Sequence, residues 1–344
     1  MKRLLHIALC ALLLALHSCE IPFEVTSASG ERFYAQCIAD TDGVGVFVRS
    51  AAPVNGKAGT QKTPNISVEV NGEPLLMENN DIRWHGDRRL KEGDRISFHI
   101  EADGMEPADG STTLPSRPVI LDCSWKKVQV DTIEATQVSL TLDQAPSDDA
   151  FFGIRIEQTT HVEGSNEWSI HYITPGYILS AAESGSFDLS DFVQVNYDGY
   201  MVGSPIYRPL TLLTKKHFDG AVYRFYLNSF DTSILDGIRG NMPSGDTGVA
   251  GGGITSGDVG SEGTNPGTLP ADVKVDITYT FTLYRLSQEF YYYAKALYQS
   301  NFDFLANMGL IPANFTWSNL DGGLGFVGAL QSAAAGPFRL DGEN

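Results

Sequence analysis

The chain has 344 residues, of which 42 are acidic and 24 basic, so its formal net charge at neutral pH is −18. An acidic chain gains no electrostatic attraction to nucleic-acid phosphates, so we do not expect nucleic-acid binding. A hydrophobic content of 42% is typical of a folded protein and argues against extensive disorder.

The first 18 residues have the pattern of a secretory signal peptide, and Cys19 follows directly after them. A positively charged start leads into an apolar stretch, residues 4–16, which is too short to span a bilayer. The small Ser18 before the cysteine resembles the cleavage site in the lipobox of bacterial lipoproteins. We therefore expect cleavage before Cys19 and lipidation of that cysteine.

Cleavage would remove two basic residues and leave 42 acidic and 22 basic residues, a net charge of −20. Anionic lipid headgroups would repel such a body, so we expect the membrane contact to be made by the acyl chains only. The mature chain, 326 residues from Cys19 to Asn344, is longer than one typical domain and predicts two.

Residues 19–30 are predicted to form a tether, and residues 31–115 an Ig-like β-sandwich. Short runs rich in β-branched and aromatic residues are separated by Gly, Asn, Asp and Pro, which is typical of antiparallel sheets. Asn71-Gly72 favours a two-residue hairpin turn. Breakers between Asp103 and Pro118 indicate the domain boundary. The expected strands are 32–38, 44–49, 66–70, 74–77 and 95–101.

Residues 116–344 are predicted to form a larger β-sandwich domain, so the fold class is mainly β with two antiparallel sandwiches. In residues 273–283 every odd position is apolar and every even one polar, which indicates a strand with one buried face. Its expected partner is the strand at 221–227. Further strands are expected at 125–133, 137–142, 152–158 and 168–173.

One helix is predicted in the second domain, over residues 287–308, with Ser287 as its N-cap. Its many tyrosines could form a sugar-stacking platform, but a wide buried face is the favoured interpretation. Before it, residues 240–267 contain 10 glycines among 28 residues and predict a long surface loop. A functional lid or partner-contact loop is the alternative interpretation.

Cys37 and Cys123 are the cysteines that remain after loss of the signal peptide and lipidation of Cys19. An exported compartment permits a disulfide between them. Both also lie in apolar, strand-like runs, where a buried free cysteine behaves as a small hydrophobic residue. The second interpretation is favoured, and the disulfide remains the alternative.

Two motifs match catalytic or cofactor patterns by letter only. Residues 323–328 match the dinucleotide fingerprint, but only 16 residues follow, where a nucleotide-binding unit needs an acidic residue about 20 positions later. Close backbone packing explains these glycines better. Residues 124–127 match S-x-x-K, yet a strand sends Ser124 and Lys127 to opposite faces.

No metal or cofactor site is predicted. The five histidines of the mature chain have no spacing suited to zinc, and the segments 40–43 and 147–149 contain the residues that turns prefer. We therefore predict no catalytic, cofactor-binding or metal-ligating residue. A pair of carboxylates for glycoside hydrolysis cannot be located without a fold. The histidines are His85, His99, His161, His171 and His217.

Residues 102–104 and 114–115, residues 286–291 and the tail 317–326 resemble the Bacteroidota lipoprotein family called domain of unknown function 4249. The resemblance covers nearly the whole mature chain, and the final helix followed by the Ser-Asn, Gly-Gly and Gly-Phe tail is its most specific part. It implies an outer-membrane lipoprotein, often encoded beside TonB-dependent transporters, with no established biochemical activity.

We therefore expect a lipid-anchored, non-catalytic accessory protein of the outer membrane, on its periplasmic face or at the cell surface. Its expected partners are a TonB-dependent outer-membrane transporter and a small nutrient or glycan ligand, contacted through loops of the second domain. The alternatives are a hydrolase acting on surface glycans and an adhesin or fimbrial-type structural subunit, which would exchange strands between protomers.

Overall fold

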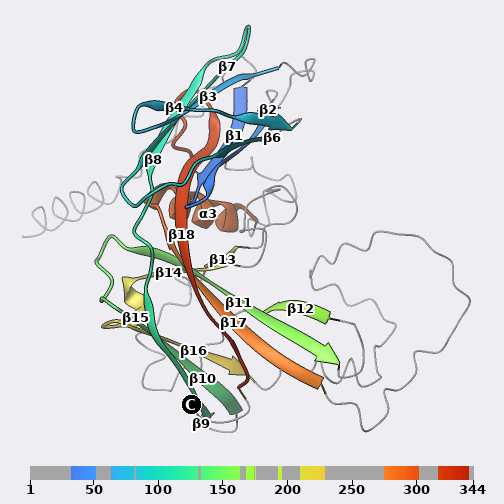
Figure 1. Cartoon of the computed structure of the whole chain (residues 1–344), viewed down its shortest axis with the longest axis vertical. Helices are drawn as coiled ribbons and strands as arrows, with labels where there is room; N and C mark the ends of the chain where they lie inside the picture. Colours follow the sequence, from blue (N-terminus) through green and yellow to red (C-terminus); the bar gives the residue numbers. More distant parts are fainter. Residues whose placement is uncertain are drawn as a thin grey trace, which may run out of the picture.

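The computed structural model describes residues 32–51, 63–80, 83–130, 133–162, 168–173, 175, 193–195, 210–228, 275–301 and 317–340. Within these residues the protein is mainly β-structure, in one long sheet and two four-stranded sheets, and one α-helix lies beside the long sheet (Figure 1). The predicted fold class is confirmed at this level. The tether, Cys19 and loop 240–267 lie outside the described residues.

The first sandwich packs a four-stranded sheet against one half of the long sheet. The four-stranded sheet has the order β4-β3-β7-β8, and the facing half of the long sheet has the order β18-β1-β2-β6-β5. Its elements are β1 (Arg32–Ala39), β2 (Gly43–Ala51), β3 (Asn65–Val70), β4 (Glu73–Leu75), β5 (Glu78–Asn80), β6 (Arg83–Asp87), β7 (Arg95–Glu101), β8 (Ala108–Thr113) and β18 (Leu324–Phe338). Asn71 and Gly72 both have positive φ in the β3–β4 turn, as predicted.

The second sandwich packs the sheet β15-β16-β10-β9 against the other half of the long sheet, β13-β14-β11-β17-β18, with β12 paired to β11. Its elements are β9 (Ile120–Val130), β10 (Ile133–Leu142), β11 (Phe151–Val162), β12 (Trp168–Ile173), β13 (Val193–Val195), β14 (Leu210–Thr214), the short 3-10 helix η2 (Lys215–His217), β15 (Phe218–Asp219), β16 (Val222–Asn228) and β17 (Val275–Leu286).

One predicted pairing was wrong. The strands expected at 221–227 and 273–283 form β16 and β17, but β16 pairs with β10 while β17 pairs with β11 and β18. The two strands lie in opposite sheets, where the rings of Phe225 and Phe281 meet edge to face with centroids 5.4 Å apart. Matching alternation identifies strands with a buried face, but it does not distinguish a neighbour in the sheet from a partner across the core.

The C-terminal strand β18 belongs to both sandwiches. Its first half pairs in parallel with β1, from Tyr34–Leu324 to Ala39–Ala329, and its second half pairs antiparallel with β17. Figure 1 shows this strand running through both parts of the molecule. Its alternate residues face different cores, because Val327 lies in the core of the first sandwich and Phe326 in a cluster under the helix. The sheet of the first sandwich is therefore completed by the end of the chain.

The helix α3 (Gln288–Asn301) packs where the two halves of the long sheet meet. Tyr291 and Tyr293 are buried among apolar neighbours, at 5% and 6% exposure, whereas Tyr292 is 38% exposed. The prediction of a buried face is confirmed for Tyr291 and Tyr293. Gln36 Nε2 of β1 donates a hydrogen bond to Tyr293 Oη at 3.1 Å. The predicted continuation of the helix, residues 302–308, lies outside the described residues.

The linker between β8 and β9 is tied to β18. Gln331 Nε2 donates to the Pro115 carbonyl at 2.7 Å, and Arg117 Nε donates to the Ser332 carbonyl at 3.0 Å. With the shared strand, these contacts limit motion between the two sandwiches within the described residues.

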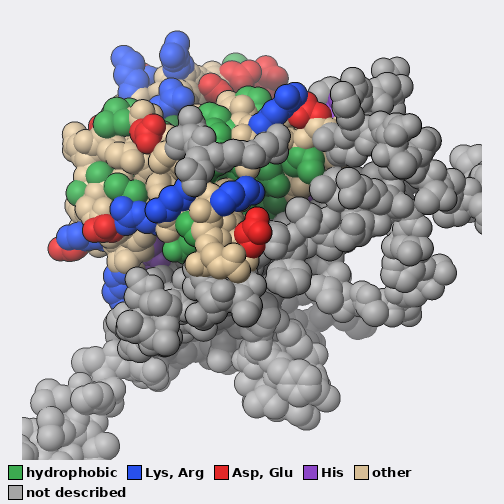
Figure 2. Space-filling view, turned by 90° about the horizontal axis from the view of Figure 1, so that it is seen from below, with side chains coloured by type: hydrophobic (Ala, Val, Ile, Leu, Met, Phe, Trp, Pro, Cys, Tyr) green, Lys and Arg blue, Asp and Glu red, His purple; other side chains and the backbone are tan. Residues whose placement is uncertain are grey.

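Figure 2 views the lower end of the molecule, where basic and acidic side chains are intermixed on the described part of the surface. No helix among the described residues is long and apolar enough to cross a membrane.

Candidate functional site

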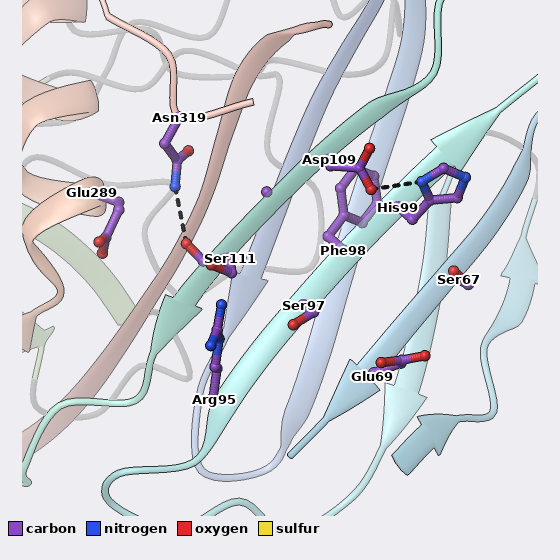
Figure 3. Close-up of a pocket in the computed structure, with 11 residues that line it drawn as sticks. Ser67, Glu69, Arg95, Ser97, Phe98, His99, Asp109, Ser111, Glu289 and Asn319 are labelled. Carbon is purple, nitrogen blue, oxygen red and sulfur yellow. Dashed lines mark hydrogen bonds and ion pairs between the residues drawn. The ribbon is translucent and has the colours of Figure 1, made fainter. Parts of the chain in front are cut away.

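A polar groove lies on the outer face of strands β3, β7 and β8 (Figure 3). Along each strand, alternation directs Val68, Ile96 and Ile100 into the core, so the residues that alternate with them face outward. The outward serines have short side chains, and the groove above them has a volume of about 700 Å³. The groove is lined by Ser67, Glu69, Arg95, Ser97, Phe98, His99, Asp109, Gly110, Ser111, Glu289 and Asn319.

Strand register arranges the lining in rows. One row contains Ser67, His99 and Asp109, and the next contains Glu69, Ser97 and Ser111. Neighbouring strands are about 4.8 Å apart, so a row across three strands is about 10 Å wide. The main-chain groups of β7 are used by the ladders to β3 and β8. The groove therefore offers side chains, not backbone, to a ligand.

The row Ser67–His99–Asp109 has the residue types of a catalytic triad but not its hydrogen bonds. His99 Nδ1 lies 2.7 Å from Asp109 Oδ1, and its Nε2 lies 3.8 Å from Glu101 Oε2. A triad histidine must instead bond to the serine hydroxyl through its second nitrogen. Among the described residues, the His99 ring pairs with two carboxylates and makes no hydrogen bond to a serine hydroxyl, so the arrangement does not activate Ser67 as a nucleophile.

One end of the groove is formed by α3 and the tail. Thr112 Oγ1 donates to Glu289 Oε2 at 2.9 Å, which fixes the first turn of the helix to β8. Asn319 Nδ2 donates to the Ser111 carbonyl at 3.3 Å and to the Val327 carbonyl at 2.9 Å. These hydrogen bonds hold Glu289 and Asn319 against β8, which is far from both residues in the sequence.

Several groove side chains remain available to a ligand. Within the described part of the chain, no hydrogen bond or ion pair engages the carboxylate of Glu69, the guanidinium of Arg95 or the hydroxyl of Ser97. Their backbones are fixed in the sheet. The sequence contained a signal for this surface, the alternation of polar and apolar residues in 65–70 and 95–101, but not for the contributions of Glu289 and Asn319.

The glycine-rich tail is used for packing, as predicted. A Cβ on Gly325 would lie 1.9 Å from the Ala35 carbonyl oxygen, and φ at this position is +103°. A Cβ on Gly322 would lie 2.1 Å from the Pro107 carbonyl oxygen. Residues 324–329 form a strand beside β1, so the fingerprint-like letters do not occupy a strand-to-helix turn.

The other rejected motifs are also structural. Lys127 lies in β9 and donates to Thr136 Oγ1 at 2.8 Å. Asp40 Oδ1 accepts hydrogen bonds from the Asp42 and Gly43 amides at 2.8 and 3.2 Å, which is turn chemistry.

The Ser147 hydroxyl donates a hydrogen bond to Asp149 Oδ1, and this bond lowers the pKa of the Asp149 carboxyl. No three potential metal ligands are grouped within the described ranges.

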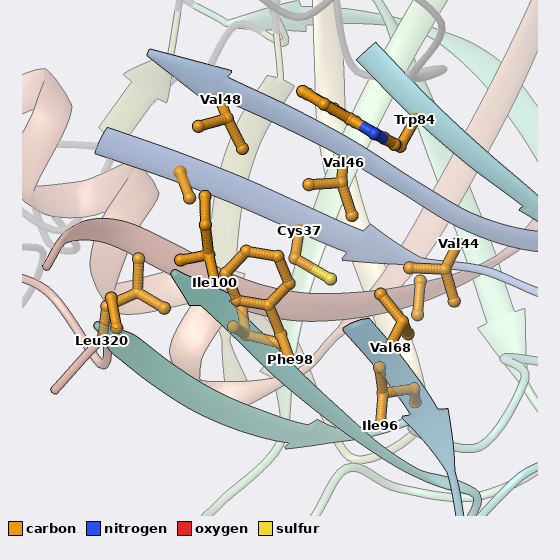
Figure 4. Packing of buried hydrophobic residues seen from close by; sticks show 14 of the residues in the cluster. Cys37, Val44, Val46, Val48, Val68, Trp84, Ile96, Phe98, Ile100 and Leu320 are labelled. Atoms are coloured by element: carbon orange, nitrogen blue, oxygen red, sulfur yellow. The ribbon is translucent and has the colours of Figure 1, made fainter. Parts of the chain in front are cut away.

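Cys37 and Cys123 are both free and buried, in different sandwiches. Figure 4 shows Cys37 among the apolar side chains of the first core. Burial raises the pKa of its thiol far above the usual range. Burial, with the Asp122 carboxylate, raises the pKa of Cys123 to about 12. The alternative of a disulfide between them is thus not realised, because the two thiols lie in separate cores.

These features define a mainly β protein of two sandwiches that share a C-terminal strand, with an open polar groove on the first sandwich. The chain belongs to the family described as Domain of unknown function (DUF4249), whose model matches residues 20–334. The match includes both sandwiches, α3 and most of β18. No curated protein matches the chain in sequence.

Proposed function

We propose that this chain is a lipid-anchored, non-catalytic binding protein of the outer membrane and an accessory to a TonB-dependent transporter. The groove supports the binding role, because it presents unengaged charged and hydroxyl side chains on a rigid sheet. The signal-peptide pattern before Cys19 supports the anchor. The 12 residues between Cys19 and Arg32 reach at most about 40 Å, so an acylated Cys19 would keep the first sandwich beside the membrane.

The geometry of the groove supports binding over catalysis. A hydrolase needs a positioned nucleophile or acid pair and donors aimed at the developing charge. Of the three carboxylates in the groove, Asp109 contacts His99 and Glu289 accepts from Thr112. Both are held by neighbouring side chains, and the groove is open to solvent.

The adhesin alternative receives less support from the fold. A subunit that exchanges strands needs an incomplete sheet or a strand that can leave its own. The terminal strand β18 is instead paired along its length, its first half with β1 and its second half with β17, and α3 covers its Phe326. Removing β18 would open both cores, because Val327 and Ala329 belong to the first and Ala335 packs on the second.

The anchor and the partner can be tested together in the native host. A C-terminally tagged chain should be found in the outer membrane with an acylated Cys19 at its mature N-terminus, and a transporter should co-purify with it from solubilised membranes. Cys19→Ala should release the protein from membranes, whereas Cys10→Ala, inside the predicted signal peptide, should leave anchoring intact. An unmodified mature N-terminus, or repeated absence of a transporter, would refute the corresponding half of the proposal.

A further inference from the structure

The hydrogen-bonding groups of the groove are mixed in kind. Glu69 is an acceptor, Arg95 is a donor, and the hydroxyls of Ser67, Ser97 and Ser111 are both. A ligand that satisfies this set must itself carry donors and acceptors at close spacing. Sugar hydroxyls combine both roles in one group, and adjacent hydroxyls can bond a carboxylate and a guanidinium bidentately.

The charge of the groove disfavours anionic ligands. Three carboxylates, those of Glu69, Asp109 and Glu289, stand against the guanidinium of Arg95, a net charge of −2 with His99 neutral. An anion would be repelled by this balance. A cation would be attracted by the carboxylates, but beside Glu69 it would also lie near Arg95, the diagonal neighbour of Glu69 on the adjacent strand, since Glu69 pairs with Ser97. A neutral ligand encounters neither penalty.

The form of the groove fits a short chain molecule. Its volume of about 700 Å³ lies within the range of small-molecule sites, and it extends from the row of Ser67 and His99 to α3 (Figure 3). A peptide that binds by adding a strand needs free backbone groups, and β7 uses its own for β3 and β8. The exposed groups are side chains, which suit hydroxyl recognition.

We propose that this groove binds a neutral carbohydrate, with Glu69, Arg95 and Ser97 in direct contact with its hydroxyls. The inference rests on the proposed binding function and adds the chemical class of the ligand. Glu69 accepts from two hydroxyls, Arg95 donates to hydroxyl or ring oxygens, and Ser97 lies between them on the floor. Glu289 and Asn319 form the end of the groove.

Isothermal titration of the mature lipoprotein tests this proposal. The detergent must have no sugar headgroup, because a maltoside would compete for the groove. The probes are neutral hexasaccharides of glucose, galactose, mannose and xylose, with hexagalacturonic acid as the anionic comparison. At least one neutral probe should bind, and more tightly than the anionic one.

Substitutions locate the binding. Glu69→Gln and Ser97→Ala should each weaken the neutral probe about fivefold, the loss expected for one hydrogen bond. Glu134→Gln on β10, an exposed carboxylate of the second sandwich, is the matched control and should change nothing. Binding of no neutral probe, or equal binding by all variants, would overturn the inference. Continued co-purification of a transporter in that case would show that the accessory function stands and only the ligand class is wrong.

Discussion

Asn319 bonds to Val327 as a neighbouring strand would. Its Oδ1 accepts from the Val327 amide and its Nδ2 donates to the Val327 carbonyl, both at 2.9 Å. A side-chain amide carries the same donor and acceptor as a peptide group, so it can continue a ladder where the backbone cannot. The same Nδ2 reaches the Ser111 carbonyl of β8. This side chain therefore closes the first sandwich between β8 and β18, which gives the Ser-Asn element of the tail a structural role.

Asn319→Ala should lower the free energy of unfolding by about 2–3 kcal/mol, because three hydrogen bonds are lost and partly buried backbone groups are left without partners. Urea denaturation measures this change. Asn65→Ala removes only an exposed bond to Glu101 and should cost less than about 1 kcal/mol. Equal losses for the two variants would show that the amide of Asn319 does not join the strands.

Ser287→Ala should destabilise the protein by about 2 kcal/mol. The hydroxyl of Ser287 accepts from the Phe290 amide at 3.3 Å, as an N-cap, and from the Ala329 amide at 3.1 Å. One buried side chain thus caps α3 and holds it to β18. Thermal unfolding followed by circular dichroism reports the loss, with Ser139→Ala on β10 as the control. An unchanged melting temperature for Ser287→Ala would contradict this dual role.

Gly325→Ala should cost several kcal/mol or prevent folding, because the new methyl group would overlap the Ala35 carbonyl and the residue has positive φ. Gly45→Ala on β2, on the far side of β1 in the same sheet, meets nothing within 4 Å and should change stability by less than about 1 kcal/mol. Soluble yield and denaturant midpoint separate the two variants. Similar behaviour of both would mean that β18 does not lie this close to β1.

The thiols of Cys37 and Cys123 should resist alkylation in the folded protein. Thiolate is the reactive form, and burial disfavours it, with a pKa of about 12 for Cys123. Because pH 9 still lies well below this pKa, thiolate stays a minor species, and the native protein should react only slowly with iodoacetamide at both pH 7 and pH 9. Mass spectrometry should find both cysteines labelled only after denaturation without reductant. Failure to label the denatured chain would indicate a disulfide, and rapid native labelling would indicate exposure.

The sequence by itself determined the features that depend on near neighbours in the chain. Alternation in residues 273–283 identified β17, Ser287 identified the start of α3, and Asn71-Gly72 identified a hairpin turn. Each of these follows from periodicity, capping or turn chemistry, which act over a few residues.

Only the tertiary structure decided which strands are partners. The parallel pairing of β1 with β18 joins residues from opposite ends of the chain, and β16 lies across a core from β17 instead of beside it. The groove depends on the same long-range choices, because Glu289 and Asn319 reach it from the far end of the sequence. Strand pairing is set by the packing of whole sheets, and that energy is not encoded in any short segment.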